Sequence, residues 1–199
     1  MTREEMRFTL LDSTVKTIEQ LGLDKATTRN ISRRANLNEA YIYRIFNDKE
    51  DLFKETFAQL DREMVTFLQN ELESVAEEET DLEAKYRPLF FAFWKYLLDN
   101  KGKCLCFIRY YFSPYFKKYS LEDHRELLVR PAGMISHDLR AGADVGMLLD
   151  HILTTMLNFA SMVINGTLAE SDDTAENVFT VAFSSVKPYL KHYSKEAYA

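Results

Sequence analysis

The chain has 199 residues, of which 46% are apolar and 28% are charged, a balance that is ordinary for a globular protein and excludes an intrinsically disordered one. With only six glycines and four prolines, it offers few turns and favours long helices. Its net charge of −6 argues against non-specific binding of nucleic acid by the protein as a whole.

Nine helices and no strand are expected along the chain, so the fold class is predicted to be all-α. In the first helix apolar residues keep helical spacing, and Gly22 is expected to end it. Thr27, Asn38 and Asp48 are expected to cap the second, third and fourth helices at their N-termini. Ser113-Pro114 is expected to interrupt the pattern. The predicted ranges are 3–21, 28–35, 39–46, 49–75, 82–99, 102–112, 121–140, 144–168 and 174–191.

Charge is distributed unevenly between the short helices and the rest of the chain. Residues 25–49 contain six basic side chains and two acidic ones, a net charge of +4, which leaves −10 for the remaining residues. A small basic region therefore belongs to an otherwise acidic protein. Such a local surplus, rather than the total charge, is the electrostatic signature of a nucleic-acid contact.

The second and third helices are short and are separated by a three- to four-residue turn, which is the helix-turn-helix pattern. Asn36 tolerates the left-handed backbone that a tight turn requires, and Ala35 is small enough for a close helix crossing. Apolar residues are expected to hold the pair against the first helix. These residues are Ile31, Leu37, Ile42, Ile45 and Phe46.

The residues left on the outer face suit contacts with duplex DNA. Glu39 could accept a hydrogen bond from a cytosine amino group, and Ala40 could contact a thymine methyl. Thr27, Thr28 and the first amides of the second helix suit phosphates, because the helix dipole favours an anion there. An ordinary helical subdomain whose tyrosines pack against neighbours is the alternative. The complete candidate set is Thr27, Thr28, Arg29, Asn38, Glu39, Ala40, Tyr41, Tyr43, Arg44 and Lys49.

The stretch TTRNISRRANLNEAYIYRIFNDKEDLF resembles the DNA-binding segment of the TetR family of one-component transcriptional regulators. The resemblance covers about residues 7–53, and the helix order extends it loosely to the end of the chain. It implies that Thr27 or Thr28, Tyr43 and Lys49 hold phosphates and that residues 38–41 face bases. Asn36 stands where the family usually has glycine, Glu39 where a basic residue is common, and Tyr41 where a small residue is usual.

The resemblance implies two domains and a homodimer. Residues 1–48 would form the helix-turn-helix DNA-binding domain, and residues 49–199 a larger helical domain for ligand binding and dimerisation through the eighth and ninth helices. A dimer places two recognition helices about 34–36 Å apart, in successive major grooves of a palindrome. The expected function is a transcriptional repressor released from its operator by a small hydrophobic or aromatic ligand. A helical small-molecule-binding or scaffold protein without a DNA role is the alternative.

Aromatic residues are concentrated in the middle of the chain, between Tyr86 and Tyr119. They could simply fill a helical core, or they could surround a cavity for a small effector. Thr155, Asn158 and Ser161 form a polar stripe on the eighth helix, facing either a ligand or a second subunit. The candidate pocket residues are Phe90, Trp94, Phe107, Tyr110, Tyr111, Thr155, Asn158 and Phe159.

Neither an enzyme nor a metal protein is indicated by the sequence. The four histidines, at positions 124, 137, 151 and 192, form no metal-binding pattern, and the Cys104-x-Cys106 pair has no second cysteine pair. No catalytic residue, metal or cofactor is therefore expected. The segment 151–169 lacks charges, but its polar stripe argues against a membrane span. No secretory signal opens the chain, and two cysteines suit a reducing compartment, so a cytoplasmic location is expected.

Overall fold

The structure, a computed structural model, describes residues 1–75 and 81–191. Within these residues the fold is all-α, as predicted, with ten α-helices, two short 3-10 helices and no strand. The acidic run at positions 77–79 and the histidine at position 192 lie outside the described ranges. The chain divides into two compact units, one comprising Met1–Glu63 and Asn100–His124, the other comprising Met64–Asp99 and Arg125–Ala199.

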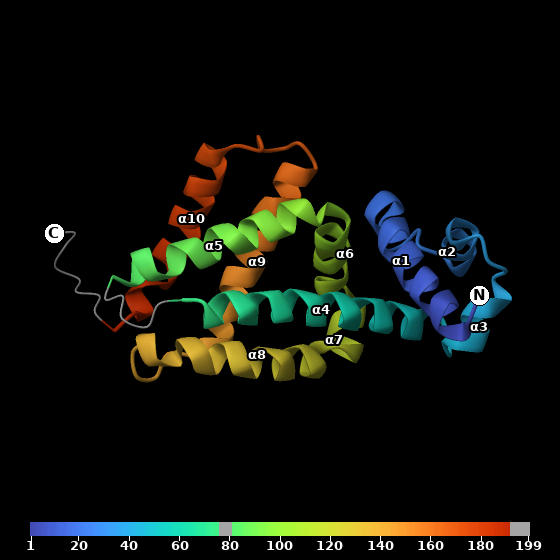
Figure 1. Cartoon of the computed structure of the whole chain (residues 1–199), viewed down its shortest axis with the longest axis horizontal. Coiled ribbons are helices and arrows are strands. Elements are labelled where there is room, and N and C mark those ends of the chain that lie inside the picture. Colours follow the sequence, from blue (N-terminus) through green and yellow to red (C-terminus); the bar gives the residue numbers. More distant parts are fainter. Residues whose placement is uncertain (76–80, 192–199) are drawn as a thin grey trace. The chain divides into compact units, whose positions relative to one another are not determined.

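The first unit is built around α1, which packs against α2, α3 and α6 (Figure 1). Side-chain caps define the helix starts, because each supplies an acceptor to an N–H that the helix itself leaves unpaired. Thr2 and Glu5 form a reciprocal capping box at the start of α1. At its end, the Arg109 guanidinium donates to the Glu19 carbonyl at 2.7 Å. The helices of this unit are α1 (Arg3–Leu21), α2 (Thr28–Ala35), α3 (Ala40–Ile45), the first part of α4 (Lys49–Glu73), α6 (Lys101–Tyr111) and α7 (Pro114–Tyr119).

The second unit is a helical bundle in which α5, α9 and α10 pack against one another. Asp144 and Ser171 cap α9 and α10 through hydrogen bonds from backbone amides three residues ahead. An antiparallel bridge between Leu139 and Leu190 joins the segment after α8 to the segment after α10. The helices of this unit are the remainder of α4, α5 (Leu82–Asp99), most of α8 (Leu121–Ile135), η1 (Ser136–Asp138), α9 (Val145–Ile164), α10 (Asp172–Val186) and η2 (Lys187–Tyr189).

Several helix boundaries differ from the sequence prediction, and α9 ends at Ile164 rather than at residue 168. Pro114 does not only interrupt the pattern but begins an additional helix, α7, because proline at the first helical position loses no internal hydrogen bond. The α-helix predicted to reach residue 140 ends at Ile135 and tightens into η1. The last helix ends at Val186, since Pro188 has no N–H to continue the ladder, and η2 follows.

One described helix, α9, is long and apolar enough to cross a membrane by length and composition, with a mean hydropathy of 1.5 over its best window. In the structure it packs against α5 and α10, and it buries residues such as Leu153, Met156 and Leu157. A core helix of a globular bundle meets the same length and composition criteria, so these properties alone do not assign a membrane role.

Candidate functional site

The turn between α2 and α3 has the backbone that the sequence predicts. Asn36 adopts a left-handed conformation, with φ 53° and ψ 40°, and the Leu37 N–H donates to the Ser32 carbonyl at 3.0 Å. Thr27 caps α2 through a hydrogen bond from the Asn30 N–H. The Asn38 side chain accepts from the Ala40 N–H at 2.9 Å, although Asn38 lies one residue before the cap position of α3. These local contacts fix the start of both helices.

Burial separates the two faces of this motif. Ile31 and Ile42 are fully buried and Phe46 is nearly so, whereas Leu37 and Ile45 are half-buried. All ten candidate DNA contacts keep some exposure. Tyr43 is 57% exposed, which makes it one of the most exposed large side chains of the described chain. Thr27, Arg29, Asn38, Ala40, Tyr43 and Arg44 are exposed, and Thr28, Glu39, Tyr41 and Lys49 are half-buried.

Several candidate residues interact with each other or with their neighbours. The Thr28 hydroxyl donates to the Glu39 carboxylate, so the proton that a phosphate would accept is already engaged. The Arg44 guanidinium lies 5.5 Å from the centre of the Tyr41 ring, and the Lys49 ammonium lies 5.0 Å from the centre of the Phe53 ring. Such cation–aromatic contacts limit the freedom of the basic side chains.

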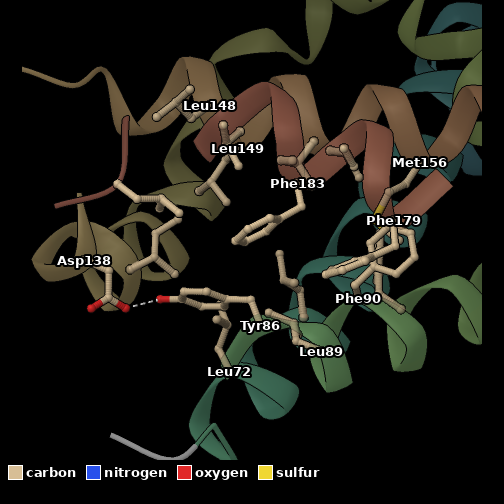
Figure 2. Close-up of a pocket in the computed structure, with 18 of the residues that line it drawn as sticks. Leu72, Tyr86, Leu89, Phe90, Asp138, Leu148, Leu149, Met156, Phe179 and Phe183 are labelled. Atoms are coloured by element: carbon tan, nitrogen blue, oxygen red, sulfur yellow. Dashed lines mark hydrogen bonds between the residues drawn. The ribbon is translucent and has the colours of Figure 1, made fainter. Parts of the chain in front are cut away.

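The second unit contains a cavity of about 160 Å³ between α4, α5, α9 and α10, bordered by the end of α8 and the segments that follow α8 and α10 (Figure 2). Its wall is almost entirely hydrocarbon, and Tyr86 and Asp138 are the two residues in it that bear a polar side chain. The lining residues are Leu68, Leu72, Tyr86, Leu89, Phe90, Phe93, Ile135, Asp138, Leu139, Leu148, Leu149, Ile152, Leu153, Met156, Phe179, Ala182, Phe183, Val186 and Leu190.

Of the eight candidate pocket residues, Phe90 lines this cavity and the other seven do not. Trp94 stacks near Phe90, with ring centres 6.3 Å apart, but stands outside the wall. Thr155 and Phe159 are half-buried elsewhere on α9, and Asn158 is exposed. The polar stripe therefore faces away from the cavity, because the α9 residues in its wall belong to the aliphatic face that begins at Leu148.

The three remaining candidates, Phe107, Tyr110 and Tyr111, belong to the first unit. Phe107 and Tyr110 pack on the Phe57 ring, at 4.7 and 4.6 Å between ring centres, and so contribute to a core. The density of aromatic residues in the sequence predicts a pocket at these rings, whereas the wall of the cavity is mostly aliphatic. The recurrence of Leu148, Ile152 and Met156 at four-residue spacing was the signal that could have identified the α9 face.

One end of the cavity carries an ion pair that is shielded from solvent. Lys85 Nζ donates to Asp138 Oδ2 at 2.8 Å, and the Tyr86 hydroxyl donates to the same oxygen at 2.5 Å (Figure 2). Burial alone would raise the pKa of Asp138, but the hydrogen bonds from Lys85 and Tyr86 bring that pKa below its ordinary value. Burial, followed by the bond to Asp138, raises the pKa of Tyr86 well above its ordinary value. Asp138 is thus a carboxylate and Tyr86 a neutral phenol near neutral pH.

Other titratable groups of the described residues have structural roles. His124 Nδ1 lies 2.9 Å from both carboxylate oxygens of Asp61, and both side chains are buried in the first unit. Burial raises the pKa of Cys104 and of Cys106 to about 12, which leaves both as unreactive thiols at neutral pH. Across residues 1–75 and 81–191, no group of three or more His, Cys, Asp or Glu side chains is arranged to hold a metal ion.

In sequence, known proteins match this chain over about a quarter to a third of its length. Residues 10–56 match the profile of a family described as bacterial regulatory proteins, tetR family. Over 62 residues the chain is 34% identical to the HTH-type transcriptional regulator BetI of Paraburkholderia phymatum, a match that covers 31% of this chain and 32% of that protein. BetI of Paraburkholderia phytofirmans gives the same identity and coverage. The chain thus spans about a third of the length of the curated relatives that it matches.

Comparison with solved structures extends over nearly the whole chain. A candidate tetR family transcription regulator from Shewanella sp. PV-4 aligns with a TM-score of 0.72 at 17% identity, covering 93% of this chain and 98% of that one. A TetR family transcription regulator from Marinobacter aquaeolei VT8 aligns with a TM-score of 0.67 at 16% identity, covering 92% and 95%. At this identity the likeness establishes a common fold.

Proposed function

We propose that the chain is a sequence-specific DNA-binding transcriptional regulator of the tetR family, because residues 10–56 match the profile of that family of bacterial regulatory proteins. The observation that carries the proposal is the helix-turn-helix at α2 and α3, whose ten candidate contacts all keep exposed surface within a region of net charge +4. The rest of the chain carries a net charge of −10 and would repel phosphate elsewhere. Binding would therefore be confined to this motif.

We assign the candidate residues to two kinds of contact. One group of phosphate contacts would lie at the start of α2 and consist of Thr27, Thr28, Arg29 and the first amides of that helix. A second group of phosphate contacts would lie along α3 and at the start of α4. The start of α3, which begins at Ala40, would face base edges in the major groove. Glu39 could accept from a cytosine only through its second carboxylate oxygen, or after releasing Thr28. The second phosphate group is Tyr43, Arg44 and Lys49, and the base-facing group is Asn38, Glu39, Ala40 and Tyr41.

A homodimer through α9 and α10 belongs to the proposal, because one recognition helix reads too few base pairs for a specific operator. The exposed face of these helices combines large apolar side chains with polar ones. Met147 on α9 is 53% exposed and Val181 on α10 is 51% exposed in the single chain. Asn158 is exposed on the same helix as Met147, and His151 Nε2 lies 2.8 Å from Ser185 Oγ. We propose that the polar stripe lies on this face and contacts the second subunit, rather than a ligand in the cavity.

The regulatory part of the proposal is repression relieved by a small hydrophobic effector in the second-unit cavity. Leu68 and Leu72 line the cavity, and both belong to α4, which begins at Lys49 among the candidate phosphate contacts. A ligand that binds more tightly when α4 is in one position than in another would favour that position and so change the affinity for DNA. The coupling free energy between ligand and DNA would be about 1–3 kcal/mol. We propose a cytoplasmic location for the protein, where its operator would be.

Gel-shift titration with DNA flanking the protein's own gene tests the proposal. The double variant Tyr43→Phe/Lys49→Ala should weaken binding to all sequences and reduce the salt dependence, whereas Glu39→Gln should change the preferred sequence. Lys95→Ala is the matched control, because Lys95 is an exposed lysine of the other unit whose side chain is 75% exposed. If all variants and the parent fail to bind any flanking DNA specifically, the alternative of a small-molecule-binding or scaffold protein is supported instead.

A further inference from the structure

The cavity of the second unit restricts the size of its occupant. Its volume is about 160 Å³, and an engineered protein cavity of about 150 Å³ that is lined by aliphatic and aromatic side chains stays dry and binds benzene. The space therefore suits one six-membered ring with a short alkyl chain. Because the wall around Leu149, Met156 and Phe183 offers no hydrogen-bonding side chain, a polar group on that part of a ligand would be buried without a partner.

The polar end of the cavity restricts the chemistry of the occupant further. Tyr86 gives its only proton to Asp138, so towards a ligand its oxygen can act only as an acceptor. Asp138 is also an acceptor, because its pKa is lowered and it stays ionised. A polar ligand group placed at this end must therefore be a hydrogen-bond donor. An anionic ligand would meet the Asp138 carboxylate and would be repelled.

The charge at this end is already balanced. Lys85 lies 2.8 Å from Asp138 with a side chain only 5% exposed, and the ring of His137 lies 3.4 Å from the other carboxylate oxygen. A cationic ligand would add a second positive charge beside Lys85 without a second carboxylate among these groups. A neutral donor adds no charge and keeps the pair intact, so a hydroxyl group matches the site better than an ammonium group.

We propose that the cavity binds a neutral monocyclic phenol or alcohol with a short alkyl substituent, whose hydroxyl donates to Tyr86 Oη while its hydrocarbon part fills the space between α5, α9 and α10. The inference rests on the proposed function in that the same cavity would hold the effector. Tyr86 Oη acts as the acceptor because its own proton is donated to Asp138. The aliphatic wall limits the size of the ligand.

Calorimetric titration of the full-length protein with four probes tests the ligand class. The probes are 4-propylphenol, its methyl ether 4-propylanisole, 4-propylbenzoate and 2-phenylethylamine. We expect the phenol to bind about fivefold to tenfold more tightly than the methyl ether, since one net hydrogen bond contributes about 1 kcal/mol. The benzoate and the amine should bind more weakly than the phenol. Equal binding of phenol and ether, or tighter binding of either charged probe, would overturn the proposal.

Two variants locate the site. Tyr86→Phe should reduce the phenol-to-ether preference to about twofold or less, while its unchanged affinity for the ether shows that the cavity is intact. A preference that persists in Tyr86→Phe would contradict the assigned acceptor. Ala182→Leu narrows the cavity and should weaken all probes, whereas Ala169→Leu, the same change at an exposed position, should not. If Ala182→Leu and Ala169→Leu weaken probe binding equally, the probes bind outside this cavity.

The same samples separate this inference from the regulatory proposal. Gel shifts with flanking DNA are run with and without saturating 4-propylphenol. A protein that binds the phenol with the expected preference, yet keeps its DNA affinity, supports the cavity assignment and contradicts the effector role. A protein that binds DNA but none of the probes keeps the regulator proposal and refutes the ligand class.

Discussion

Replacing Asp138 by asparagine should destabilise the second unit by about 3 kcal/mol, because it leaves the Lys85 ammonium buried without a counter-charge. The side chains of Lys85 and Asp138 are only 5% and 13% exposed, so water cannot replace the lost partner. The lower end of the usual range for a broken buried pair, about 3–5 kcal/mol, is expected because the amide oxygen of the new asparagine can still accept from Tyr86. In a protein of this size the change corresponds to a fall of about 6–12 °C in Tm.

Trp94 provides the assay, because it is the single tryptophan and is buried in the second unit. Urea denaturation followed by its fluorescence gives the free energy of unfolding of that unit. Lys85→Met/Asp138→Asn should be less destabilised than the sum of the two single variants, by about 2 kcal/mol, because the double variant leaves no charge unpaired. The control is Asp99→Asn, which breaks an exposed pair with Lys95 and should cost less than about 0.5 kcal/mol. Strict additivity, or an effect of Asp138→Asn as small as that of Asp99→Asn, would refute the reasoning.

Two further predictions concern acid stability and the helix-turn-helix. The pKa of Asp138 is lower in the folded protein than the unfolded value of about 3.9, so its contribution is present above that value and is lost as pH falls through the folded pKa. Below about pH 4 the free energy of unfolding, measured by Trp94 fluorescence, should therefore fall less in Asp138→Asn than in the parent. The variant lacks the titrating group beside Lys85, Tyr86 and His137. Equal slopes of the free energy of unfolding against pH in the two proteins would contradict this. Asn36→Ala should destabilise the first unit by about 1 kcal/mol relative to Asn36→Gly, because φ is 53° at this position. Thermal melts followed by far-UV ellipticity check it, and equal Tm values for the two variants would be the contrary result.

Local interactions made the all-α class and the helix-turn-helix readable from the sequence. The interactions that form the motif join residues within a turn or two of each other, so their pattern can be recognised in the linear sequence. These features are the Thr27 cap, the left-handed Asn36 and the buried Ile31 and Ile42. The extra helix at Pro114 was missed because proline both breaks and begins helices, and neighbouring packing decides which applies.

The cavity could not be placed from the sequence, because its wall is assembled from helices far apart in the chain. Aromatic density pointed to Phe107 and Tyr110, yet tertiary packing commits both rings to a core around Phe57, whereas the cavity takes Leu148 and its aliphatic neighbours. Likewise, no spacing rule pairs Tyr86 with Asp138, which are 52 positions apart. Capping and periodicity act over a few residues, but the shape and charge of a cavity are properties of long-range contacts, which only the folded chain specifies.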